Sequence, residues 1–166
     1  MTWQRNSSEP RVEREVERYH YTECGLDNIY LVNGFQAEEL DGYVYTFVNN
    51  PDMLHRVISI DLAHKADSLS GREIRILRKE MNLTQSELAI YFDVTAQTVA
   101  RWEKGEVDIP RASELLLRAL MLCNVEGTVD VFGLTEELSG MDRPTRREFL
   151  NFQMRDAEWP STRDGN

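Results

Sequence analysis

The sequence predicts an α+β protein, with a small N-terminal antiparallel β-sheet plus helix followed by an all-α domain of about five helices. Three observations support this prediction. Aromatic and β-branched residues cluster over 19–48, around the turn dipeptides Asn33-Gly34 and Asp41-Gly42. From Asn50 to Cys123, apolar residues recur at helical spacing instead. Helix-capping residues stand ahead of several of these runs.

The composition fits one ordinary domain or two small ones. The chain has 166 residues, 41% of them hydrophobic, and no apolar run approaches the ~20 residues that cross a bilayer. Residues 1–18 are polar and mixed in charge, unlike a signal peptide, so we expect a flexible arm and a cytoplasmic protein. Val12 and Val16 in this arm are also compatible with a weak helix.

The sheet is expected within a β+α domain over 19–66, which serves dimerisation, partner binding or ligand binding. Its last run alternates Tyr43, Tyr45 and Phe47 on one face with Val44, Thr46 and Val48 on the other. The run FQAEEL (35–40) is compatible with a strand or a loop. We expect the aromatic residues to form the core of the sheet rather than a ligand pocket or a protein-binding face; they are Tyr19, Tyr21, Tyr43, Tyr45 and Phe47.

Capping residues place the helices on either side of a linker at Ala66–Leu69. Asn50-Pro51 is an N-cap followed by proline at the first helical position, and predicts a helix over Asp52–Lys65. Ser70 caps Gly71–Met81, whose inner face carries Ile74 and Leu77. A strongly apolar helix follows from Arg111 to about Cys123, either buried or facing a partner subunit.

The segment Leu83–Gly105 holds two short helices joined by a tight turn. Thr84 and Glu87 have capping-box spacing, and the first helix breaks at Asp93-Val94. Thr95 then opens a helix over Ala96–Lys104, and Gly105 suits a left-handed end. Within Ser70–Arg111 seven positive and seven negative residues balance, so the remainder carries the whole net charge of −10.

The second of these helices has the side chains that a DNA groove requires near its start. Short or amide side chains there approach base edges most closely, and Gln97 can pair bidentately with adenine. Arg101, one turn on, can reach guanine or a phosphate, and Gln85 can meet a phosphate at the preceding helix start. Val94, Val99 and Trp102 are expected to face the core. The predicted DNA-contacting set is Gln85, Thr95, Ala96, Gln97, Thr98, Arg101 and Lys104.

With Arg78 before it, this segment resembles the helix-turn-helix of phage Cro and repressor proteins and of the xenobiotic-response-element regulator family. The shared features are T-Q-x-E-L-A, T-x-Q-T-V-x-R-W-E-x-G and a proline soon after, and the similarity covers about Leu69–Leu122. It implies a helix-turn-helix DNA-binding domain over 67–125, base or phosphate contact by the residues named above, and a structural ion pair between Arg78 and Glu103. Trp102 completes this scaffold.

The N-terminal part more loosely resembles antitoxins in which a zinc-finger-like domain precedes a helix-turn-helix. Those proteins hold zinc with two CxxC pairs, whereas this part of the chain has Cys24 alone. The resemblance therefore implies no zinc site in this chain. Cys24 and Cys123 are expected to be buried free thiols. The three histidines lie apart without ligand spacing, with His55 and His64 expected to face solvent. We therefore expect no metal site and no cofactor.

No catalytic constellation is present in the sequence, so we expect no enzyme. A single helix-turn-helix offers few contacts, which favours a homodimer on a palindromic operator with half-sites ~34 Å apart. The dimer contact is left open between the helix at 111–123, the N-terminal sheet and the C-terminal segment. That segment, 126–166, is expected to be a helical extension, with helices over Leu134–Leu138 and Pro144–Met154 and a frayed tail.

These observations leave three functions to compare. The first is a sequence-specific transcriptional autorepressor that is the antitoxin of a toxin–antitoxin operon, whose acidic body suits a basic toxin. The second is a stand-alone regulator whose N-terminal domain senses a small molecule or a metal. The third is a metal or thiol protein with a vestigial DNA motif, which the full set of polar contact positions disfavours.

Overall fold

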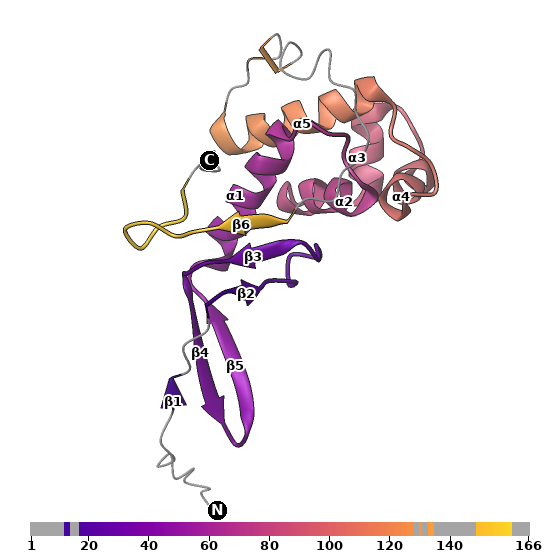
Figure 1. Ribbon diagram of the computed structural model, residues 1–166. Coiled ribbons are helices and arrows are strands. Elements are labelled where there is room, and N and C mark those ends of the chain that lie inside the picture. Colours follow the sequence, from indigo (N-terminus) through magenta and orange to yellow (C-terminus); the bar gives the residue numbers. More distant parts are fainter. Residues whose placement is uncertain (1–11, 14–16, 128–129, 131–132, 135–148, 161–166) are drawn as a thin grey trace, which may run out of the picture.

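The computed structural model describes residues 12–13, 17–127, 130, 133–134 and 149–160. Strands come first, five helices follow, and one further strand comes near the end, as the α+β prediction requires (Figure 1). The strands are β1 (Val12–Glu13), β2 (Tyr19–His20), β3 (Ile29–Leu31), β4 (Phe35–Leu40), β5 (Tyr43–Val48) and β6 (Leu150–Phe152). The helices are α1 (Pro51–His64), α2 (Gly71–Glu80), α3 (Gln85–Phe92), α4 (Ala96–Lys104) and α5 (Arg111–Glu126).

The strands form two sheets rather than one. In the first, of order β1-β4-β5, the two longer strands make a hairpin whose turn places Asp41 (φ 54°) and Gly42 (φ 78°) in the left-handed region. This is the turn that the Asp-Gly dipeptide predicts. The FQAEEL run is therefore a strand, and Val12 in the expected flexible arm pairs with Glu39 instead of forming a helix.

The second sheet, of order β2-β3-β6, corrects the prediction of a C-terminal helix over Pro144–Met154. β6 lies beside β3 (Figure 1) and pairs with it in parallel. Leu150 and Phe152 are buried, and Asn151 between them is exposed. Alternate burial of this kind is the signature of a strand, and it outweighs the capping-box spacing. Residues 144–148, and most of the helix expected over 134–138, lie outside the described residues.

The C-terminal tail is also less frayed than expected, up to residue 160. Trp159 is 2% exposed, and its indole Nε1 donates to the Asn49 carbonyl at 2.9 Å. Its ring lies where a Cβ on Gly34 would come within 2.8 Å of it, so the glycine of the Asn33-Gly34 turn makes room for this side chain. The C-terminal segment thus packs on the N-terminal strands.

The β4–β5 hairpin does not contribute its aromatic residues to the core. Tyr43, Tyr45 and Phe47 are 69%, 48% and 55% exposed, so their expected place in a sheet core is wrong. The hairpin extends away from the helices (Figure 1), and among the described residues no helix packs on the face that carries these three side chains. The core is instead made by the second sheet with α1 and the other helices, and Tyr21 is its one buried tyrosine among the described residues.

The predicted helix starts are confirmed. Asn50 caps α1 with Pro51 in its first turn, and Ser70 forms a capping box with Glu73 at the start of α2. Helix α5 runs three residues further than the predicted Cys123 and ends where Gly127 adopts φ 76°. None of the helices in the described ranges is long and apolar enough to cross a membrane.

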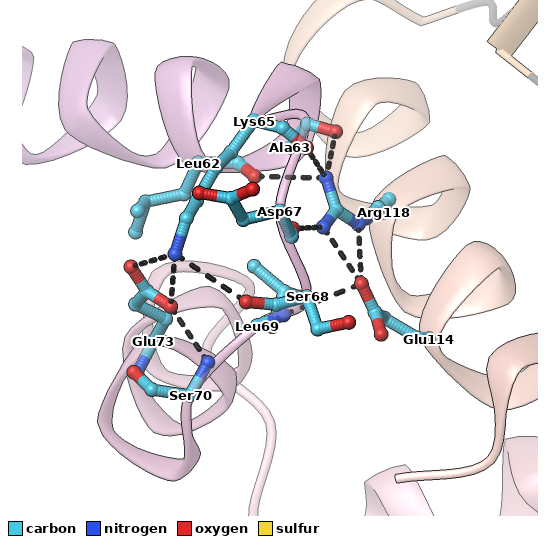
Figure 2. A network of polar contacts seen from close by, with 10 residues as sticks. All are labelled: Leu62, Ala63, Lys65, Asp67, Ser68, Leu69, Ser70, Glu73, Glu114 and Arg118. Atoms are coloured by element: carbon cyan, nitrogen blue, oxygen red, sulfur yellow. Dashed lines mark hydrogen bonds and ion pairs between the residues drawn. The ribbon is translucent and has the colours of Figure 1, made fainter. Parts of the chain in front are cut away.

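The buried face of α5 holds a complete guanidinium among its apolar residues. Arg118 has no exposed surface, and its Nη1 donates to the carbonyls of Leu62, Ala63 and Lys65 at 3.3, 3.0 and 2.6 Å. Its Nη2 donates to the carbonyl of Asp67 at 2.7 Å (Figure 2). Arg118 therefore satisfies the carbonyl groups left open where α1 ends and the linker begins.

Two carboxylates complete this network. Glu114 accepts from Arg118 Nη2 at 2.7 Å and from the Leu69 amide at 3.3 Å, and Lys65 Nζ donates to Glu73 Oε1 at 2.9 Å (Figure 2). Both ends of the linker are thus held, one by α5 and one by the α2 capping box. The linker between α1 and α2 is therefore fixed to α5 and α2 through polar contacts, beside the apolar core that the strands and helices share.

We expect Arg118→Met to lower the free energy of unfolding by about 3–5 kcal/mol. The change leaves the Glu114 carboxylate buried without its counter-charge and several buried carbonyls without a donor. Urea denaturation followed by circular dichroism measures the loss. Arg111→Met, at the exposed start of the same helix, is the matched control and should change stability by less than about 1 kcal/mol; equal losses for the two variants would contradict the role given to Arg118.

Candidate nucleic-acid interface

The turn between α3 and α4 is set by three consecutive residues. Asp93 takes a left-handed conformation (φ 52°) that ends α3, with its amide bonded to carbonyls in the last turn. The Val94 amide donates to the Ala89 carbonyl at 3.1 Å, and Thr95 Oγ1 accepts from the Thr98 amide at 3.2 Å, which starts α4. The chain therefore reverses within three residues, as the sequence predicts for 93–95.

The start of α3 is fixed by the predicted capping box. Thr84 Oγ1 accepts from the Glu87 amide at 3.1 Å, and Glu87 Oε2 accepts from the Thr84 amide at 2.7 Å. These hydrogen bonds stabilise the charged form, so they lower the pKa of the exposed Glu87 carboxyl below its ordinary value. The first turn of α3 is consequently ordered before any ligand binds.

One face of α4 is packed inward. Val99 is fully buried, and Trp102 is 3% exposed with its ring edge-on to Phe92 at 5.8 Å between centroids. Val94 is half-buried against the same core. The opposite face is left to solvent, because residues 97, 101 and 104 are one helical turn apart on the other side of the cylinder. The exposed residues are Thr95, Gln97, Arg101 and Lys104, with Ala96 and Thr98 half-buried beside them.

The Glu103 carboxylate joins the three helices α2, α3 and α4. It is 1% exposed and accepts from Arg78 Nε at 2.5 Å and from Arg78 Nη2 at 3.1 Å. Gln85 Nε2 donates to it at 2.9 Å and Arg75 Nε at 3.3 Å. The ion pair that the family resemblance implies is therefore present, and the Gln85 side chain, expected to meet a phosphate, is a member of the same cluster.

The charge of Glu103 is held by its partners against the effect of burial. Burial alone raises the pKa of this carboxyl, but hydrogen bonds from Arg78 and Gln85, and the charges of Arg78 and Arg75, lower it further than burial raises it. The pKa consequently lies below that of an ordinary glutamate. A carboxylate ionised at neutral pH thus fixes the angle between α2 and α4.

A glycine allows the close approach of α2 to the end of α4. A Cβ on Gly71 would lie 2.5 Å from the Trp102 carbonyl oxygen and 2.6 Å from that of Glu103. Both contacts are with backbone atoms, which cannot move aside as a flexible side chain can. The start of α2 therefore requires glycine for space rather than for a left-handed conformation.

Comparison with known proteins gives the class of this arrangement. Residues 74–117 match the family model described as helix-turn-helix. The matched range covers α3, α4 and all the residues of the Glu103 cluster, and supports a DNA-binding transcriptional regulator. No curated protein and no solved structure gives a significant match to the chain.

Two cations of the helix-turn-helix are paired in the free protein. Glu106 lies 3.6 Å from Arg101 Nε and 3.7 Å from Lys104 Nζ, and all three side chains are at least half exposed. Exposed pairs at such distances contribute about 0–1 kcal/mol, so a phosphate can displace Glu106. The carboxylate beside the predicted DNA-contacting face is a feature that the sequence analysis did not single out.

A cavity of about 220 Å³ lies beside the helix-turn-helix, between α1, α2 and the loop after β2. His55, on its wall, accepts or donates a hydrogen bond at 2.5 Å with the Tyr21 hydroxyl, so its expected solvent exposure is wrong, while His64 is exposed. Burial lowers the pKa of His55 and raises that of Cys24. The lining residues are Glu23, Cys24, His55, Ile58, Ile76, Lys79 and Glu80.

The thiols are less buried than expected. Cys24 is half-buried and Cys123 is exposed, because α5 continues past Cys123 with that side turned to solvent. Within the described part of the chain no group of three or more histidine, cysteine or acidic side chains is arranged to hold a metal ion.

We expect Glu103→Gln to lower the free energy of unfolding at pH 7 by about 3 kcal/mol, since Arg78 loses its carboxylate partner. A carboxyl whose pKa is lower in the folded state stabilises the protein above its unfolded pKa and loses that effect as pH falls through its folded pKa. The difference between variant and wild type should therefore shrink below pH 4. Urea unfolding at several pH values measures it.

The control for this change is Glu106→Gln, which removes a half-exposed carboxylate three residues after Glu103 that pairs with Arg101 instead of Arg78. It should leave the acid-dependent loss of stability as in the wild type. A Glu103→Gln protein with unchanged stability at pH 7, or with a constant difference from the wild type down to pH 3, would refute the coupling of Glu103 to Arg78.

Proposed function

We propose that this protein is a sequence-specific transcriptional autorepressor that binds a palindromic operator as a homodimer and acts as an antitoxin. The observation that carries the DNA-binding part is the outer face of α4, where exposed amide, hydroxyl and cationic side chains stand on a helix anchored by Trp102 and Glu103. A helix held in this way can enter the major groove as a rigid element.

Each polar residue of this face has a nucleic-acid group that it fits. Gln97 matches the N6 and N7 groups of adenine, and Thr98 matches a base edge or the thymine methyl group. Arg101, one turn on, reaches guanine or a phosphate, and Lys104 extends the contact along the backbone. Nearest the edge of the groove lie Thr95, Ala96 and the backbone amide of Gln85 at the start of α3. Together these positions cover one half-site.

The antitoxin role is supported by the charge distribution. Residues 70–111 are neutral, so the net charge of −10 belongs to the rest of the chain. A surface of this kind repels non-specific DNA and attracts a basic protein. Such a partner would meet the sheet domain, whose helix α1 and following linker accept hydrogen bonds from Arg118 of α5.

The cavity beside α2 favours a second candidate function, a stand-alone regulator that senses a small molecule. Lys79 and Glu80 on its wall belong to α2, the helix that Glu103 fixes to α4. A molecule bound there would contact the sheet domain and the DNA-binding domain together. The charged and apolar lining suits a small polar organic ligand.

Gln97→Ala with Arg101→Ala should weaken binding to the selected operator by about 2–6 kcal/mol, since each good base contact is worth about 1–3 kcal/mol. The operator is first obtained by selecting bound duplexes from a random pool, which also gives its symmetry and half-site spacing. Titration by fluorescence anisotropy at fixed salt then gives the affinity. Unchanged affinity of a folded double variant would overturn the placement of α4 in the groove.

Glu106→Gln should change the affinity for DNA in the opposite direction to the double alanine variant. It frees Arg101 and Lys104 for phosphates, so the affinity for DNA should be higher than that of the wild type. The affinity should also decrease more steeply as the salt concentration increases. Asp108→Asn removes the same charge without breaking either pair and should raise affinity less. Equal effects of the two variants would show that only net charge matters.

Co-expression with the neighbouring reading frames separates the two candidate functions. As an antitoxin, the protein should form a stable complex with a small basic protein encoded beside it and relieve the growth arrest that this protein causes. As a sensor, it should form no such complex, and a metabolite should raise its melting temperature, an effect that Ile76→Trp, which fills the cavity, should abolish.

A further inference from the structure

Strand β5 is the free edge of the first sheet. The sheet order is β1-β4-β5, and no other strand in the described ranges pairs with the outer side of β5. The edge is six residues long and regular, with each residue of β5 opposite one residue of β4. It therefore presents a row of unpaired backbone donors and acceptors.

The alternation of hydrogen-bonded and non-hydrogen-bonded pairs in the β4–β5 hairpin identifies which residues of β5 carry the unpaired backbone groups. Leu40 and Tyr43 flank a two-residue turn, so they exchange both of their hydrogen bonds with each other. The same phase reappears at the other end, where the Asn49 amide donates to the Gly34 carbonyl at 2.8 Å. Every second residue of β5 faces outward in this pattern, and these residues are Val44, Thr46 and Val48.

This edge lacks the features that usually protect a sheet edge. β5 contains no charged residue and no proline, and four of its six side chains are exposed apolar or aromatic groups. Proteins commonly place lysine, proline or a bulge on such a strand to prevent pairing. The exposed side chains are Tyr43, Val44, Tyr45 and Phe47, at 69%, 49%, 48% and 55%.

We infer that β5 pairs with β5 of a second copy of this chain, antiparallel across a two-fold axis, to form a continuous six-stranded sheet. Charge favours a second copy as the occupant. The chain outside 70–111 carries the whole net charge of −10, so two copies repel over most of their surface, whereas the β5 edge brings only uncharged residues together. A basic partner would find no counter-charge on this strand.

An antiparallel pairing of two β5 strands would bring together their unpaired backbone groups and their exposed aromatic side chains. A two-fold axis near Thr46 places its outward amide and carbonyl against those of the second copy, and sets the aromatic face of each strand beside its equivalent. The hairpin projects from the body (Figure 1), so its edge is open to approach. The inference rests on the proposed homodimer and assigns its contact to the sheet, one of the segments left open by the sequence.

The test measures the mass of the full-length protein by sedimentation velocity over a range of concentrations. The wild type should be a dimer, and Phe47→Lys should be a monomer. With the axis near Thr46, the variant sets a charged side chain opposite Tyr45 of the second copy and puts two like charges on one face of the joined sheet. Gln36→Lys is the matched control: it lies directly opposite Phe47 on the same face of the hairpin, but on the central strand β4, and should remain dimeric.

A second variant acts through the backbone. Thr46→Pro removes one outward amide without taking a hydrogen bond from β4, and should also give a monomer. Amide hydrogen exchange in the wild type tests the same contact without any variant, so the test still stands if a variant does not fold. The amides of Val44, Thr46 and Val48 should be protected in the dimer and exchange faster on dilution, whereas those of Tyr45 and Phe47, bonded to β4, should not change with concentration.

A monomeric wild type, dimeric Phe47→Lys and Thr46→Pro variants, or outward amides that exchange at the same rate at all concentrations would each overturn the inference. The first of these outcomes would leave β5 to a different protein. Operator binding and amide exchange together separate this inference from the proposed function. A dimer with protected outward amides that binds no DNA refutes the function alone, whereas a dimer that binds its operator while its outward amides exchange freely refutes the β5 contact alone.

Discussion

The bidentate ion pair between Arg78 and Glu103 is the interaction on which the DNA-binding domain depends. Three helices of eight to ten residues each are too short to hold their mutual angles by propensity alone. The carboxylate at the end of α4 accepts from α2 through Arg78 and from α3 through Gln85. Because guanidinium and carboxylate meet in a planar fork, this contact fixes orientation as well as distance.

A second buried guanidinium, that of Arg118, acts in the same way on the linker between α1 and α2. Arg118 holds carbonyls of the linker, whereas Arg78 holds helices of one domain. Buried ion pairs add little net stability compared with apolar residues of the same volume, but they permit few alternative geometries. The fold thus uses apolar packing for stability and two arginine–glutamate pairs for the relative placement of its parts.

The parts that sequence reasoning predicted are those governed by neighbouring residues. Capping at Asn50, Ser70 and Thr84 and the turn at 93–95 depend on side chains within four positions, and Glu103 became a partner of Arg78 through the family resemblance. β6 was missed because its parallel pairing with β3 joins distant segments, and the Glu106 contacts because exposed charges carry no pattern. Tyr43 and Phe47 were misplaced because alternation shows which residues share a face, not whether anything covers it.

The parallel pairing of β6 with β3 makes the five helices an insertion within one sheet. Ribosomal synthesis therefore releases β3 long before its partner strand exists. The helices can begin to pack on one another during this interval, whereas Ile29 and Leu31 gain their parallel partner strand only once β6 has been made. Completion of the second sheet thus requires both segments, whereas the β4–β5 hairpin and the five helices consist of residues that are made before β6.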